Sequence, residues 1–261
     1  MFVLCVLKSF NRENVMRIRR QTSLLIALFV AISSIFVLAD PPQAQPKITE
    51  KSFSGINDLK ITVRMVAPYA AKTDLQIVCV FKHNPAGDKY IEAFQDFDDK
   101  LRGLLSSLRN RGEFIGELGE TILFYTWPGS ITPKRVLVIG LGPEKDLSLD
   151  TLRLVGRVAL REAVRLRAED VAFAPVIRDQ GNSALDVGEV DRAFVEQVVL
   201  AYDTEKRLQE EGVTDRFSIR EWVIEAGPAF IEGAIENVGA GIESASSEVR
   251  QIGRASCRER V

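Results

Sequence analysis

The sequence predicts an α/β domain in which helices cover both faces of a mixed sheet. Two short, almost wholly apolar runs, LQIVCVF at 75–81 and RVLVIGLG at 135–142, are typical of strands buried on both faces. Segments with apolar residues at three- and four-residue spacing alternate with such runs along the chain. The 261 residues are 46% apolar, so the chain is long and apolar enough to bury the core of one domain of generous size.

Six strands are expected from apolar runs and from alternation. The first of them, LKITVRMV, alternates apolar and polar side chains, as a half-exposed strand does. Turn residues such as Pro128 and Gly129 separate neighbouring runs. The expected strands are 59–66, 75–81, 119–127, 135–142, 171–177 and 217–225.

Three helices are expected between these strands and a fourth after the last of them. Ser148 and Asp150 can cap the second helix, and Asp186 with Glu189 resembles a capping box at the start of the third. Pro228 begins the last helix. The expected apolar stripes run through 90–108, 152–166, 187–201 and 231–242, the first of them as one continuous helix.

The first 39 residues are expected to be a signal peptide or an N-terminal anchor. A basic stretch at 16–20 precedes fifteen uncharged residues, Leu24 to Leu38, and Ala39 is small enough for a cleavage site. The apolar run is shorter than the roughly 20 residues that span a bilayer. We expect export to the periplasm or the exterior if the signal is real, and a cytoplasmic protein otherwise. The segment 40–58, with its PPQAQP run, is expected to be a linker.

The last eleven residues, QIGRASCRERV at 251–261, have no helical or strand period. They resemble the translation of a short-read sequencing adapter, which predicts a non-native tail and a natural sequence that continues past it. A basic tail without fixed structure is the alternative. The folded domain is therefore expected at 59–250.

The charge balance of the middle of the chain argues against a nucleic-acid partner. Residues 40–251 carry 26 basic and 34 acidic side chains, a net charge of −8. A surface that binds nucleic acid needs lysine and arginine to neutralise phosphates. The chain has one histidine, His83, which leaves little for a Ser-His-Asp triad or a zinc site.

Gly140, Leu141 and Gly142 end a strand and precede a helix, where a phosphate-binding loop would lie. The third glycine of a dinucleotide fingerprint would fall at Lys145, and the helix signal begins only at Ser148. We therefore expect a structural turn here rather than a nucleotide site.

Cys79 and His83 would lie about 13 Å apart on a strand and its following loop, too far to share a metal.

Three groups of polar residues are expected to be structural. Asp96, Asp98 and Asp99 are interpreted as a solvated helix face, because nothing in their spacing indicates a pocket. Glu117 and Glu120 are interpreted as turn residues. Ser130, in PGSIT, lacks the second glycine of a nucleophile elbow. We predict no catalytic, cofactor-binding or metal-binding residue in this chain.

Two stretches, FIGELGETILFY at 114–125 and RVLVIGLGPEKDLSLDTLRLVGRVALREA at 135–163, resemble the N-terminal domain of leucyl aminopeptidases, the cytosol aminopeptidase family. The order of the motifs matches as well: a glycine-containing turn, a strand ending in a glycine pair, and a threonine–leucine–arginine helix start. The segment AFVEQVVLAYDTEK at 193–206 and the helix at 229–245 are also similar to that family.

The resemblance implies a macro-domain-like α/β fold and a role in a two-domain metallopeptidase that removes N-terminal residues such as leucine. It implies two divalent ions, zinc or manganese, in a C-terminal catalytic domain, and a homo-hexamer of full-length chains. The family segment N-T-D-A-E-G-R-L has no counterpart here. We therefore expect an inactive N-terminal domain whose main partner is its own catalytic domain.

Two other functions remain open. The first is a secreted macro-like module that binds a nucleotide-derived ligand without peptidase activity. The second is a structural subunit that assembles only with complete chains. The peptidase interpretation predicts a reading frame that continues for roughly two hundred residues or more, the length of a second domain.

Overall fold

The computed structural model describes residues 49–258, with side chains up to residue 252. A seven-stranded mixed sheet runs through this part of the chain in the order β1-β2-β7-β6-β3-β5-β4. The five inner strands are parallel to one another, and β1 and β4 pair antiparallel at the two edges. The prediction of an α/β domain with a mixed sheet is confirmed.

All six expected strands are present, and a seventh precedes them. The additional strand, β1, lies inside the segment 40–58 that we interpreted as a linker. It consists of two charged residues, two serines and one partly buried apolar residue, Phe53, so its sequence carries almost no strand signal. The strands are β1 Glu50–Ser54, β2 Lys60–Arg64, β3 Leu75–Val80, β4 Thr121–Tyr125, β5 Arg135–Gly140, β6 Asp170–Ala174 and β7 Glu221–Glu225.

The helices follow the predicted stripes except at the first, which is broken in two. Arg102 and Gly103 both adopt positive φ, which ends α2 and lets α3 start in a new direction. The carboxylate of Asp98 then accepts a hydrogen bond from the amide of Leu105 in the first turn of α3. The helices are α2 Glu92–Lys100, α3 Leu104–Asn110, α4 Leu149–Arg165, α5 Val187–Glu210 and α6 Ile231–Arg258, with single 3₁₀ turns at Ile56–Asp58, Glu144–Asp146 and Arg178–Gln180.

The last helix also differs from the expectation. α6 continues to Arg258, so its backbone includes most of the segment 251–261 that we expected to lack helical structure. The predicted signal or anchor at 1–39 lies outside the described residues. Among the helices between residues 49 and 258, none is both long and apolar enough to cross a bilayer.

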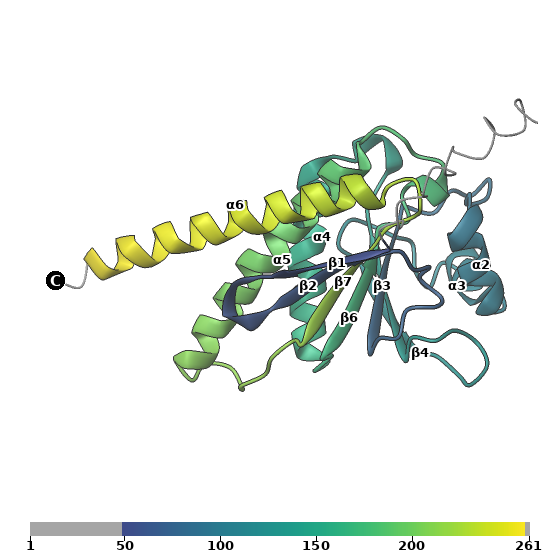
Figure 1. Cartoon of the computed structure of the whole chain (residues 1–261). Coiled ribbons are helices and arrows are strands. Elements are labelled where there is room, and N and C mark those ends of the chain that lie inside the picture. Colours follow the sequence, from purple (N-terminus) through teal and green to yellow (C-terminus); the bar gives the residue numbers. More distant parts are fainter. Residues whose placement is uncertain (1–48, 259–261) are drawn as a thin grey trace, which may run out of the picture. The chain divides into compact units, whose positions relative to one another are not determined.

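The sheet separates two hydrophobic cores. Leu75, Ile77 and Cys79 of β3 pack with α4, α5 and α6, whereas Val78 and Val80 of the same strand pack with α2 and α3. The alternation of a strand's side chains between faces explains this division. In Figure 1, α4 and α5 lie behind the sheet, and α2 and α3 lie at its right-hand side.

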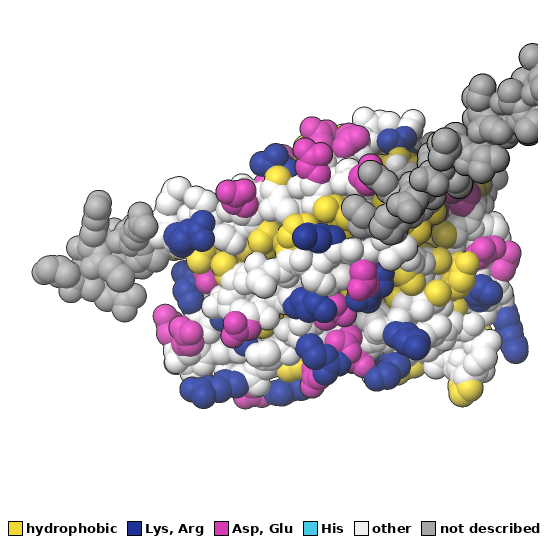
Figure 2. Space-filling model, in the orientation of Figure 1, with side chains coloured by type: hydrophobic (Ala, Val, Ile, Leu, Met, Phe, Trp, Pro, Cys, Tyr) yellow, Lys and Arg dark blue, Asp and Glu magenta, His cyan; other side chains and the backbone are white. Residues whose placement is uncertain are grey.

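The neighbouring strands β1, β2 and β7 carry charges of both signs. The carboxylate of Glu221 accepts from Lys60 and Arg64, and Arg64 also donates to Glu50. Figure 2 shows basic and acidic side chains interspersed over this view and a band of hydrophobic side chains that follows α6. This face of the molecule is therefore mixed in charge.

Gly140 is required by a close backbone approach at the end of β5. A Cβ atom at this position would lie 2.0 Å from the carbonyl oxygen of Glu117. The segment 116–120 crosses the strand end here, with hydrogen bonds from Gly119 to Gly140 and from Gly142 to Gly116. The glycine pair thus lets one loop pack directly on a strand end.

We predict that Gly140→Ala destabilises the fold by about 3 kcal/mol, because backbone atoms of the 116–120 loop must move to admit a methyl group. Urea unfolding measures this change. Gly233→Ala is the matched control: no atom lies within 4 Å of the added Cβ in α6, so this variant should be neutral or slightly more stable. Equal stability of the two variants would show that the close approach is absent.

Candidate functional site

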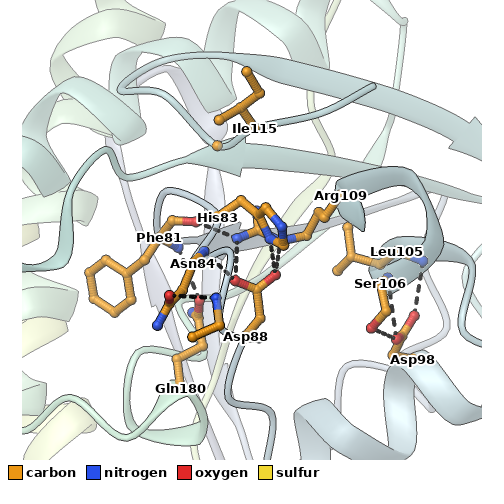
Figure 3. A network of polar contacts seen from close by, with 12 residues as sticks. Phe81, His83, Asn84, Asp88, Asp98, Leu105, Ser106, Arg109, Ile115 and Gln180 are labelled. Atoms are coloured by element: carbon orange, nitrogen blue, oxygen red, sulfur yellow. Dashed lines mark hydrogen bonds and ion pairs between the residues drawn. The ribbon is translucent and has the colours of Figure 1, made fainter. Parts of the chain in front are cut away.

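The loop after β3 is held by a buried arginine. Arg109, on α3, is 1% exposed and donates from Nη2 to the carbonyl oxygen of Phe81 at 2.7 Å. Its guanidinium also pairs with both carboxylate oxygens of Asp88. Figure 3 shows Asp88 between Arg109, His83 and Asn84. The arginine therefore joins α3 to both ends of the 81–88 loop.

The carboxylate of Asp88 is the centre of this network. His83 Nδ1 lies 3.0 Å from Asp88 Oδ2, and the amide of Asn84 donates to Oδ1 at 3.0 Å. Burial raises the pKa of Asp88, but the hydrogen bonds from Arg109, Asn84 and His83 outweigh it and hold this pKa below its usual value. Asp88 is thus an anion fixed by three donors, and its oxygens are occupied inside the chain.

Gln180 joins the loops that follow β3 and β6. Its Nε2 donates to the carbonyl oxygens of Cys79 and Val176, and its Oε1 accepts from the amide of Phe81 at 3.0 Å. The side chain is buried and every one of these partners is backbone. The carboxyl edge of the sheet between β3 and β6 is therefore filled by the chain itself.

A pocket of about 130 Å³ opens at the neighbouring part of the same edge. It lies outside the carboxyl ends of β2, β6 and β7, the place where α/β sheets commonly bind ligands. Its lining is mainly apolar, from segments 66–68, 174–177, 185–190 and 226–230. Three ionisable side chains complete it: Arg178, Asp179 and Glu225.

Glu225 lines this pocket and is the least satisfied polar residue of the edge. The residue is 7% exposed, and within the described residues neither carboxylate oxygen has a hydrogen-bond partner. Burial raises the pKa of Glu225 to about 8, and the side chain of Gln76 offsets only part of this effect. A buried acid without a partner needs a physical explanation.

A second buried acid, Asp191 on α5, shares this condition. It is 1% exposed, and both of its carboxylate oxygens lack a partner within residues 49–252. Burial, with a contribution from the charge of Asp186, raises its pKa to about 8. Neither acid can be recognised from the sequence, because Glu225 ends an ordinary strand and Asp191 lies beside other charged residues of a helix.

The candidates from the sequence lie mostly at structural positions. Cys79 is buried in β3, and burial raises the pKa of its thiol. His83 is engaged by Asp88 rather than by Cys79. Within the described residues, no group of three or more His, Cys, Asp or Glu side chains is arranged to hold a metal ion. Ser130 closes a turn by donating to the carbonyl oxygen of Trp127.

The interpretation of the acidic residues needs one correction. Asp98 is 3% exposed and is not part of a solvated face, because it caps α3 through Leu105 and Ser106. Asp96 and Asp99 are exposed as expected. Glu120 does more than flank its turn: its carboxylate accepts hydrogen bonds from successive amides of the 115–117 segment.

Comparison with known proteins identifies the family. The family described as "Cytosol aminopeptidase family, N-terminal domain" matches residues 77–211. The chain belongs to this family. A probable cytosol aminopeptidase of Thermosynechococcus vestitus is 30% identical over 118 residues, which are 45% of this chain and 22% of that protein. The cytosol aminopeptidase of Pseudomonas aeruginosa is 28% identical over 116 residues, 44% of this chain and 22% of that protein.

The match thus spans less than a quarter of the length of these cytosol aminopeptidases. Among solved structures, the macrodomain of Oceanobacillus iheyensis with ADP superposes with a TM-score of 0.54 at 13% identity. The alignment covers 75% of this chain and 98% of that one. The likeness shows the fold, and the expectation of a macro-domain-like α/β fold is confirmed.

The two buried acids predict an unusual dependence of stability on pH. Between about pH 4.5 and pH 8, folded Glu225 and Asp191 hold protons that the unfolded chain has lost. The free energy of unfolding should therefore fall as the pH rises through this window, by up to about 1.4 kcal/mol per pH unit for each group.

Urea unfolding at several pH values across this window measures the slope. The double variant Glu225→Gln with Asp191→Asn should flatten it and be more stable than the parent at the alkaline end. Glu221→Gln is the control. Its ion pairs lower the pKa of Glu221, so any change of stability with pH that Glu221 causes lies below this window. A parent protein with no slope would contradict the assignment.

Proposed function

We propose that this chain is the N-terminal, non-catalytic domain of a metal-dependent aminopeptidase that releases N-terminal residues from peptides. The observation that carries the proposal is the family match over residues 77–211. Two divalent ions, held by the catalytic domain, would supply Lewis-acid chemistry for peptide hydrolysis. The resemblance assigns their ligands to a C-terminal domain and none of them to this chain.

The role of the domain in this proposal is to position and assemble the enzyme. The hydrogen bonds of Arg109, Asp88 and Gln180 run to the chain's own loops. These contacts favour the role of a rigid scaffold. The hydrophobic band along α6 is a surface suited to contact with a second domain (Figure 2). We propose the catalytic domain as this partner, and a homo-hexamer as the assembly of full-length chains.

The proposal is tested on the parent gene and on the two proteins. We expect the reading frame to continue for roughly two hundred residues or more past codon 251. The full-length protein should hydrolyse a leucyl anilide in the presence of zinc or manganese and lose this activity with a chelator. The present chain, purified in parallel as the control, should show no hydrolysis. A natural stop codon soon after residue 250 would contradict the proposal.

We also propose export through the N-terminal segment. The relatives above are named cytosol aminopeptidases, so this location would distinguish the present protein from them. Expression of a fusion from Met16 followed by mass spectrometry of the mature N-terminus tests it. A new N-terminus at Asp40 in the exported fraction is the expected result, and an intact Met16 in the cytosol would end the export proposal.

One observation favours a second function, the binding of a nucleotide-derived ligand. The pocket at the carboxyl ends of β2, β6 and β7 belongs to a fold shared with a macrodomain solved with ADP. Titration of the chain with ADP-ribose, followed by calorimetry, tests this function. Binding by a chain whose gene ends near residue 250 would favour the binding module over the peptidase domain.

A further inference from the structure

The size of the pocket limits what it can hold. An apolar cavity of about 150 Å³ holds one benzene-sized molecule, and this pocket measures about 130 Å³. A single ring or a branched body of four or five carbon atoms therefore fits within it. Pro68, Val176 and Phe230 are among the apolar residues that would contact such a body.

The charges of the lining favour a ligand that donates hydrogen bonds. Asp179 accepts from the amide of Phe94, and Arg178 donates to the carbonyl oxygen of Leu185. Glu225 is left with two acceptor oxygens and no partner among the described residues. Burial is the main influence on its ionisation, and the side chain of Gln76 acts in the opposite direction.

We propose that this pocket binds a small apolar primary amine, whose ammonium group pairs with Glu225 and whose carbon body fills the apolar lining. The ammonium group supplies three donors to a buried carboxylate whose charged form is favoured, among the described residues, only in part by the side chain of Gln76. A charge-assisted hydrogen bond is stronger than a neutral one. The same contact satisfies the buried acid, which an alcohol or a hydrocarbon of equal size satisfies less well.

A phosphate-bearing ligand fits this lining less well. Two of the three ionisable side chains are acids, and the guanidinium of Arg178 already has a backbone partner. The lining places one guanidinium beside two acids, so it has no excess of positive charge for an anionic ligand. An amine therefore matches the pocket better than the phosphates of a nucleotide.

Binding of the amine should release a proton. Because burial raises the pKa of Glu225 to about 8, its carboxyl group is mostly neutral at pH 7. The bound ammonium favours the ionised form, so the carboxyl proton leaves to solvent as the ion pair forms. Affinity should therefore be roughly ten-fold or more higher above pH 8 than below pH 7.

Calorimetry on the full chain with 3-methylbutylamine tests the proposal, and 3-methylbutan-1-ol is the neutral ligand of matched size. We expect the amine to bind, the alcohol to bind at least ten-fold more weakly, and the heat to vary with the ionisation enthalpy of the buffer. Glu225→Gln should abolish the preference for the amine. Glu221→Gln, at the opposite end of β7, should retain it and serves as the control.

Three results would overturn the proposal: no binding of the amine, equal binding of amine and alcohol, or unchanged amine binding by a folded Glu225→Gln variant. ADP-ribose binding without amine binding would instead assign the pocket to a nucleotide-derived ligand. None of these measurements involves peptide hydrolysis. Failure of the amine site is therefore distinguishable from failure of the proposed peptidase role.

Discussion

The peptide groups of Phe81 form the point on which the carboxyl edge of the sheet depends. Its amide donates to Gln180 and its carbonyl oxygen accepts from Arg109. Both side chains come from segments remote from Phe81 in the sequence. Arg109 is also paired with Asp88. Removal of one partner of a buried ion pair costs about 3–5 kcal/mol, since the other charge stays buried. The exit of β3, the start of the 81–88 loop and the position of α3 are fixed together.

This arrangement divides the edge into two unlike parts. Around the exit of β3, Gln180 and Arg109 satisfy backbone groups of the chain, although Arg109 Nη1, Gln76 Oε1 and the hydroxyl of Tyr90 have no partner within the described residues. Beside β7, Glu225 is buried without such a partner. Burial of a polar group without a hydrogen bond costs free energy. A ligand that bonds to Glu225 would therefore lower the free energy of the folded protein at this second part of the edge.

The fold could be predicted where burial alone decides structure. The runs at β3 and β5 have one interpretation because both of their faces are apolar, and the Ser148 cap of α4 acts within its own turn. β1 was missed because a charged edge strand is stabilised by its neighbour rather than by its own apolar residues. The break after α2 was missed because the apolar stripe continues across Gly103, although the backbone there is left-handed.

The candidate site was harder to predict because its contacts are not local. Asp98 caps a helix seven residues away, and Gln180 meets Phe81 across 99 positions of sequence. The missing partners of Glu225 are a property of the packed fold, and no spacing of residues encodes them. The glycine pair at the end of β5 is expected to form a turn, but the crossing of the 116–120 segment that requires Gly140 appears only in three dimensions.

Cys79 has a consequence for where the protein can work. It is the free cysteine of the described part of the chain, it lies in the middle of the central sheet, and burial suppresses its thiolate. Oxidants and thiol reagents react with exposed thiolates, so this side chain is shielded from both. Cys79 is consequently insensitive to redox conditions as long as the sheet stays folded.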